Sequence, residues 1–170
     1  MRISVTLLAM GLALTVSSEA FAGGFKGRFA KQNSSGGLTA GKASGFNGSN
    51  GSFGRGKGFY SDGQGNAVRG KGTAFNTTNG SGGRGSMYQH HADGSSSYQS
   101  QAQYQGNNGS SYNSAGGWNK GADGTYSGSK NTTATNQNGG SYTGSSSYSN
   151  GSFNHSGSCT NASGETVACR

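Results

Sequence analysis

The chain of 170 residues contains no proline and very few of the side chains from which a globular core is built. Its hydrophobic content is 28% and its charged content 11%, whereas globular domains have roughly 45–50% and 25%. After residue 22 the branched aliphatic residues are Leu38, Val68 and Val167. Ordering each residue costs about 1–2 kcal/mol of backbone entropy, and burying one such side chain returns about 1.5–3 kcal/mol. The composition therefore excludes an ordinary hydrophobic core.

Groups that carry catalysis are also scarce. After residue 22 the acidic residues are Asp62, Asp93, Asp123 and Glu165. The chain has no paired carboxylates, no Gly-x-Ser-x-Gly elbow, no zinc-binding helix and no phosphate loop. The pair His90-His91 would point to opposite faces of a strand, which is a poor geometry for chelating a metal. We expect no enzyme activity, no cofactor and no metal site.

The start of the chain has the three regions of a secretory signal peptide. Met1-Arg2 is basic, residues 3–16 are almost entirely apolar, and Ala20-Phe21-Ala22 has the small-x-small form of a cleavage site. The apolar run is shorter than the roughly 20 residues of a membrane span, and no later run is apolar. The sequence predicts a signal peptide over 1–22 and no transmembrane segment after its cleavage. We expect a secreted protein of the extracellular matrix or cell surface, with the periplasm as the alternative location.

Positive charge is concentrated in the region 23–84. This region contains nine basic residues and one acid, Asp62, while charges balance from residue 85 onward. A basic half on a secreted protein favours acidic partners such as polysaccharide, lipopolysaccharide or extracellular DNA. The alternative is a net charge that only opposes self-association. The residues expected to bind an acidic polymer are Arg55, Lys57, Arg69, Lys71 and Arg84.

Turn signals recur along the chain at regular intervals. Ala92-Asp93-Gly94 returns thirty residues later as Ala122-Asp123-Gly124, and Asn-Gly and Asp-Gly alternate at intervals of about fifteen residues. Both dipeptides favour two-residue type I′ hairpin turns, whose central positions need positive φ. The expected turn residues are Asp62, Gly63, Asp93, Gly94, Asn108, Gly109, Asp123, Gly124, Asn138 and Gly139.

Between these turns the side chains alternate with the period of a β-strand. Tyr98 and Tyr104 would share one face while the glutamines between them occupy the other, and further aromatic pairs recur six residues apart. In residues 53–59 every second residue is glycine, which leaves one face bare enough for another sheet or a ligand to approach. The aromatic residues expected to drive self-assembly are Tyr98, Tyr104, Tyr112, Trp118, Tyr126, Tyr142 and Tyr148.

These patterns predict an all-β, repetitive fold, either a β-solenoid or a cross-β hairpin stack with units of about 15 and 30 residues. A largely disordered Gly/Ser/Asn-rich chain is the alternative. The predicted segments are the signal peptide 1–22, a basic Gly/Phe-rich region 23–84, a Tyr/Ser/Asn/Gln-rich repeat region 85–157, and a terminal hairpin 158–170. In an oxidising compartment Cys159 and Cys169 are expected to close that hairpin with a disulfide.

In general character the chain is similar to curlin-type functional amyloid subunits, which are secreted, repetitive and rich in Gly, Asn, Gln and Ser. The fixed internal Gln and Asn positions of curlin units have no counterparts in this repeat, so we assign no family. The expected function is a secreted structural protein of a bacterial surface or biofilm matrix that assembles with itself. The alternatives are a monomeric adhesin or carbohydrate- or ice-binding module, and a disordered antimicrobial or toxin-like polypeptide.

Overall fold

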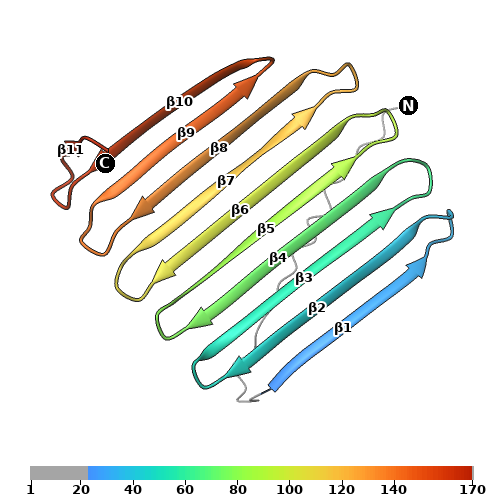
Figure 1. Cartoon of the computed structure of the whole chain (residues 1–170), viewed down its shortest axis with the longest axis horizontal. Coiled ribbons are helices and arrows are strands. Elements are labelled where there is room, and N and C mark those ends of the chain that lie inside the picture. The colour runs from blue at the N-terminus through green and yellow to red at the C-terminus, as the bar shows by residue number, and fades with distance from the viewer. Residues whose placement is uncertain (1–22, 170) are drawn as a thin grey trace.

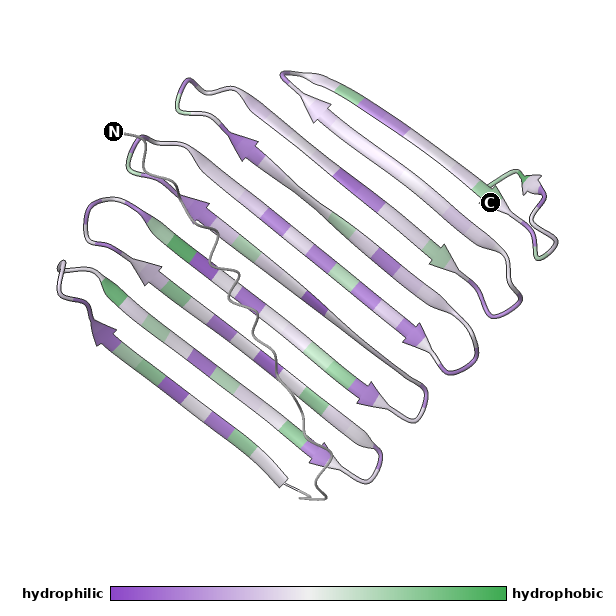
Figure 2. Ribbon diagram, turned by 180° about the vertical axis from the view of Figure 1, so that it is seen from behind, coloured by the Kyte–Doolittle hydropathy of each residue, from purple (hydrophilic) through white to green (hydrophobic). Residues whose placement is uncertain are grey.

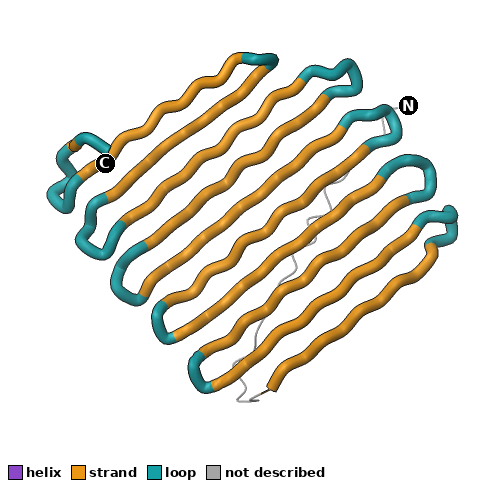
Figure 3. Tube along the Cα trace, in the orientation of Figure 1, coloured by secondary structure: helices purple, strands orange, loops and turns teal. Residues whose placement is uncertain are grey.

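The computed structural model describes residues 23–169 as one open sheet in which each strand pairs antiparallel with the next (Figures 1 and 3). The predicted all-β, repetitive fold is confirmed, and its form is a hairpin meander. The predicted signal peptide lies outside the described residues. The strands are β1 (Gly23–Gln32), β2 (Leu38–Gly48), β3 (Gly51–Ser61), β4 (Ala67–Thr77), β5 (Gly80–His90), β6 (Ser96–Gly106), β7 (Ser111–Lys120), β8 (Tyr126–Thr135), β9 (Ser141–Ser149), β10 (Ser152–Thr160) and β11 (Thr166–Val167).

The sequence period follows from the similar lengths of β1–β10, which have 9 to 11 residues each. One strand and one loop together take about fifteen residues, and two such units return the chain to the same end of the sheet. We call the end with loops 33–37, 62–66, 91–95, 121–125 and 150–151 the first rim. The loops at the other end form the second rim. Asp62, Asp93 and Asp123 lie at the first rim, and Asn108 and Asn138 at the second.

Most loops differ from the two-residue type I′ turn that the sequence suggests. In the loop 91–95 the His91 N–H donates to the Ser95 carbonyl (3.0 Å) and the Gly94 N–H to the His91 carbonyl (2.9 Å). Gly94 has φ +85° while Asp93 keeps negative φ, which is a three-residue loop closed by a left-handed glycine. Only at Asn150-Gly151 do both residues have positive φ among the described positions. In the loop 91–95 the glycine adopts the left-handed conformation, and the Asp93 side chain serves as a hydrogen-bond acceptor for the Ser95 N–H.

The register divides the side chains between two distinct faces. In antiparallel pairing, residues opposite one another point to the same side, so each row of partners across the sheet belongs to one face. The aromatic face carries Phe53, Arg55, Lys57 and Phe59 of β3, together with the residues that lie directly opposite them, strand after strand, across the sheet. The polar face carries glycine across much of β2–β5 and Ser, Thr, Asn and Gln on β6–β10. Figure 2 shows hydrophilic and hydrophobic residues interspersed along the strands.

The sheet is a single layer without a hydrophobic core. Among residues 23–169 no hydrophobic residue is buried, and the buried polar side chains are Ser96 and Ser114. Aromatic side chains remain largely accessible, with Phe46 58% and Phe153 65% exposed. The order of the sheet therefore rests on backbone hydrogen bonds and on contacts between side chains of neighbouring strands.

An aromatic row crosses strands β5 to β9 on the aromatic face, close to the first rim. The ring of Trp118 lies 6.2 Å from that of Tyr98, 6.0 Å from that of Tyr88 and 5.5 Å from that of Tyr126, measured between centroids. Tyr126 continues the row to Tyr148 at 5.4 Å. The expected pairing of aromatic residues six apart on one face is confirmed, because Tyr98 with Tyr104 and Tyr112 with Trp118 occupy the same side. The row links strands β5 to β9.

The two edges of the sheet are different. The edge strand β1 is exposed along its whole length. At the opposite edge, β11 pairs with Cys159 and Thr160 at the end of β10, and the predicted Cys159–Cys169 disulfide is present with a Cα–Cα distance of 5.4 Å. The terminal hairpin is thereby fastened to β10.

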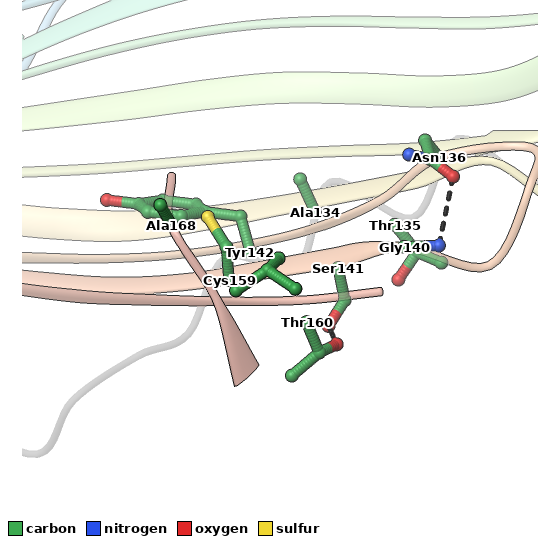
Figure 4. Close-up of a pocket in the computed structure, with 10 residues that line it drawn as sticks. Ala134, Thr135, Asn136, Gly140, Ser141, Tyr142, Cys159, Thr160 and Ala168 are labelled. Atoms are coloured by element: carbon green, nitrogen blue, oxygen red, sulfur yellow. Dashed lines mark hydrogen bonds between the residues drawn. The ribbon is translucent and has the colours of Figure 1, made fainter. Parts of the chain in front are cut away.

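An open hollow of ≈ 580 Å³ lies beside this hairpin (Figure 4). Its lining includes Ala134, Tyr142, Cys159, Val167 and Ala168. At its rim the Gly140 N–H donates to the Asn136 side-chain oxygen at 3.0 Å. The hollow brings together apolar and neutral polar groups, with no acid or base in its lining. Within residues 23–169, no helix has the length and apolar character needed to cross a membrane.

Candidate binding surface on the aromatic face

The positive charges of β1–β5 gather on the aromatic face. Register places Arg28, Lys42, Lys57 and Lys71 in one row, each directly opposite the next on an adjacent strand. The two rows that lie two residues to either side along the strands contain further cations. We call the whole set the cation block: Lys26, Arg28, Lys42, Arg55, Lys57, Arg69, Lys71 and Arg84. It contains all five residues expected to bind an acidic polymer, and each of its members is exposed.

The cation block opposes the stability of the sheet that carries it. Neighbouring strands lie about 4.8 Å apart, and like charges directly opposite one another are destabilising. Lys57 has such a neighbour on both sides, Lys42 and Lys71. The Arg55 guanidinium is held by a hydrogen bond from its Nε to the Ser44 hydroxyl at 3.0 Å. Folding of the single sheet therefore does not account for this line of four cations.

Phenylalanine flanks the cation block on the same face. Phe46, Phe53 and Phe75 form a row of direct cross-strand neighbours on β2, β3 and β4. This row lies two residues from Arg55 along the strand, a distance of about 7 Å. Phe46 and Phe53 are 58% and 44% exposed. Each of the three strands therefore presents a phenyl ring near one end and cations at its centre.

The opposite face of the same strands is nearly bare. Gly54, Gly56 and Gly58 of β3 lie in register with small residues on β2 and β4. We call the positions Gly58, Gly70, Gly72 and Gly85 the glycine patch. Phe25 and Phe29 also occupy this face, on the edge strand β1, where Phe29 lies over Gly41. Tyr60 is on this face too, so the adjacent Phe59 and Tyr60 cannot act on one ligand.

The carboxylates of the first rim are engaged within their own loops. Hydrogen bonding from the Ser95 side chain and backbone N–H lowers the pKa of Asp93. The same arrangement with Thr125 lowers the pKa of Asp123, through bonds of 2.7 Å from the hydroxyl and 3.0 Å from the N–H. For Asp62 the Asn66 side-chain amide is the main cause of the lowered pKa. These acids serve as loop acceptors.

Acid should weaken the Asp123 loop and spare its Asn108 counterpart. A lowered folded-state pKa means that the carboxylate's stabilisation is complete above about pH 4 and is lost as the pH falls through the lowered pKa. We expect the Thr125 amide resonance to titrate below about pH 4 in NMR spectra. Asp123→Asn should abolish that titration. The Ser110 N–H donates to the Asn108 side-chain oxygen at 3.1 Å, and its chemical shift should not change over the same pH range. A Thr125 midpoint at or above the ordinary Asp value would contradict this account.

Two features of these surfaces were beyond the sequence expectations. The five expected cations share their face with three more, Lys26, Arg28 and Lys42. Following the alternation of side chains from strand to strand across each loop could have placed these three residues on the same face. The loop acceptors Asn33, Asn136 and Asn161 precede Gly by three residues rather than by one. The basic region is continuous with the repeat region, because Arg84 and Gly85 are neighbours within β5.

Comparison with family models, curated proteins and solved structures finds no match to this chain.

Proposed function

We propose that this protein is a secreted, non-enzymatic structural component of a bacterial surface or extracellular biofilm matrix, which assembles with copies of itself in a functional-amyloid-like manner. The observation that carries the proposal is the glycine patch on the polar face. Backbone without side chains lets a second sheet approach closely. The Cys159–Cys169 disulfide supports an oxidising compartment.

The fold of a single chain does not require these glycines. A Cβ atom added at Gly58 would lie 3.7 Å from the nearest atom, at Gly70 3.9 Å, at Gly72 3.6 Å and at Gly85 3.7 Å, all ordinary contacts. Glycine in a strand is less stable than alanine by roughly 0.5–1 kcal/mol. The patch thus costs the isolated sheet roughly 2–4 kcal/mol. We attribute that cost to contact with a second copy, whose own glycine patch can pack against this one.

Filling the glycine patch should separate folding from assembly. We expect Gly58→Thr, Gly70→Thr, Gly72→Thr and Gly85→Thr together to raise the thermal unfolding midpoint, because β-branched residues suit strands. The same variant should remain monomeric in sedimentation velocity at concentrations at least tenfold above those at which the wild-type mature chain forms oligomers or fibres.

The matched control changes the other face by the same kind of residue. Ser86→Thr with Ser100→Thr adds branched side chains on the aromatic face of β5 and β6, and it should assemble like the wild type. A wild-type mature chain that stays monomeric in electron microscopy and sedimentation would overturn the proposal. So would a filled patch that assembles at the wild-type concentration.

A further inference from the structure

We propose that the cation block and its phenylalanine row bind single-stranded nucleic acid. The block contains four cations in a cross-strand row, and a bound polyanion would offset their mutual repulsion. This inference concerns the aromatic face and does not depend on assembly through the glycine patch, which lies on the opposite face.

The arrangement matches the two needs of a single strand. Proteins that bind single strands without sequence preference combine cations along the phosphate backbone with aromatic rings on which bases stack. Here the row Arg28–Lys42–Lys57–Lys71 provides the charges, and Phe46 and Phe53 provide exposed rings on the same face. The rings lie about 7 Å from Arg55 along the strand, so a backbone on the cations can place its bases over the phenyl row.

Shape argues against a duplex as the ligand. The major groove of B-DNA is about 12 Å wide and admits a helix or a two-stranded ribbon. The cation block spans β1–β5 of an open sheet, about 19 Å from the first strand to the fifth (Figure 1). A surface of that width cannot enter the groove, so it would contact a duplex only at its phosphates.

The chemistry of the flanking residues argues against an acidic polysaccharide. Sugar hydroxyls need hydrogen-bond partners, and phenylalanine offers none, whereas a base stacks on a ring without one. Between the cations the aromatic face provides Ser44, which accepts from Arg55, together with Thr73 and Ser86. The surface is therefore rich in charged donors and π faces and, beyond these three hydroxyl groups, poor in hydrogen-bond acceptors.

Charge removal within one register row provides the first test. The probe is a fluorescent oligothymidylate of about 20 nucleotides, longer than one binding site, and the readout is anisotropy at several salt concentrations with the mature chain. Each lost phosphate contact lowers the salt slope by about 0.7 for single strands. We expect Lys42→Gln, Lys57→Gln and Lys71→Gln together to lower the slope by about 2 and the affinity by about a hundredfold at 0.1 M salt.

Lys130→Gln is the matched control for charge. Lys130 lies on β8 in the continuation of the same row, outside the cation block, and its loss should change affinity less than twofold. The triple variant should fold at least as well as the wild type, because it removes like-charge neighbours. Thermal unfolding followed by circular dichroism checks that point before binding is measured.

Removal of the rings provides the second test. Phe46→Ala and Phe53→Ala should each lower affinity about tenfold with an unchanged salt slope, since stacking carries no charge. Phe25→Ala should leave affinity unchanged, because Phe25 lies on the polar face. Repeating both tests in the filled-patch variant, which should stay monomeric, separates nucleic-acid binding from assembly.

Three results would each overturn the proposal. The first is oligothymidylate binding that survives the triple lysine change. The second is equal affinity for a duplex of the same sequence. The third is tighter binding to an acidic polysaccharide such as hyaluronate, with no effect of the phenylalanine changes, which would identify that polymer class as the ligand.

Discussion

Trp118→Ala is expected to lower the free energy of unfolding by about 2–4 kcal/mol, because Trp118 contacts three rings and each such pair contributes about 0.5–1.5 kcal/mol beyond its buried area. Those partners are Tyr88, Tyr98 and Tyr126, on strands β5, β6 and β8. In a sheet without a buried hydrophobic residue among its described positions, this cluster is the nearest equivalent of a core. Urea unfolding followed by far-UV circular dichroism measures the loss.

Two further variants test whether the cluster, rather than any aromatic residue, is responsible. Trp118→Phe keeps a ring in the row and should lose less than half as much. Tyr112→Ala changes the same strand and face at a side chain that is 38% exposed, and it should cost about 1 kcal/mol. Equal losses for Trp118→Ala and Tyr112→Ala would show that the aromatic row does not act as a unit.

Gly117→Ala and Gly72→Ala are expected to change stability in opposite directions. A Cβ atom at Gly117 would collide with the carbonyl oxygen of Tyr98 on β6 and lie 3.1 Å from the Gln99 Cα. The pairing of β6 with β7 would have to open, at a cost of about 2–3 kcal/mol. At Gly72 the added atom meets its nearest neighbour at 3.6 Å, and stability should rise by roughly 0.5–1 kcal/mol.

Thermal unfolding of the two single variants beside the wild type is sufficient to measure this contrast. If both substitutions destabilise the sheet equally, the glycines of the patch are needed for the fold itself. In that case the glycine patch would not be evidence for contact with a second copy. If neither substitution changes the unfolding temperature, the Gly117 backbone does not lie against the Tyr98 carbonyl as described above.

Alternation made the faces predictable, whereas the details of loops and register were not. The even spacing of Tyr98 from Tyr104 and of Phe53 from Phe59 is enough to place each pair on one face, since side chains in a strand alternate. The thirty-residue interval between Asp93 and Asp123 likewise indicated two strands and two loops. Loops this short join neighbouring strands, which leads to the observed order in which each strand pairs with the next.

The turn type could not be predicted from the sequence because Asp-Gly is compatible with more than one kind of loop. The dipeptide fits a two-residue type I′ turn and also a three-residue loop that ends in a left-handed glycine. At Asp93 the neighbouring Ser95 provides donors that favour the second form. The full extent of the cation block also depended on register, because Lys42 and Lys57 become neighbours only when the loop 49–50 has its actual length.

The number of long strands determines how copies of this sheet can continue one another. Within residues 23–169 ten long strands run alternately up and down, so β1 and β10 point in opposite directions. A second copy shifted sideways by ten strand spacings, with no rotation, therefore meets the part of β10 that β11 leaves unpaired, Ser152–Ser158, with an antiparallel β1. The step is about 48 Å, and because the two edges differ, it generates an open chain with a direction rather than a closed ring. Along such a ribbon each molecule would contribute one cationic segment, β1–β5, followed by one tyrosine-rich segment with few charges, so the two kinds of surface would alternate with the period of the molecule.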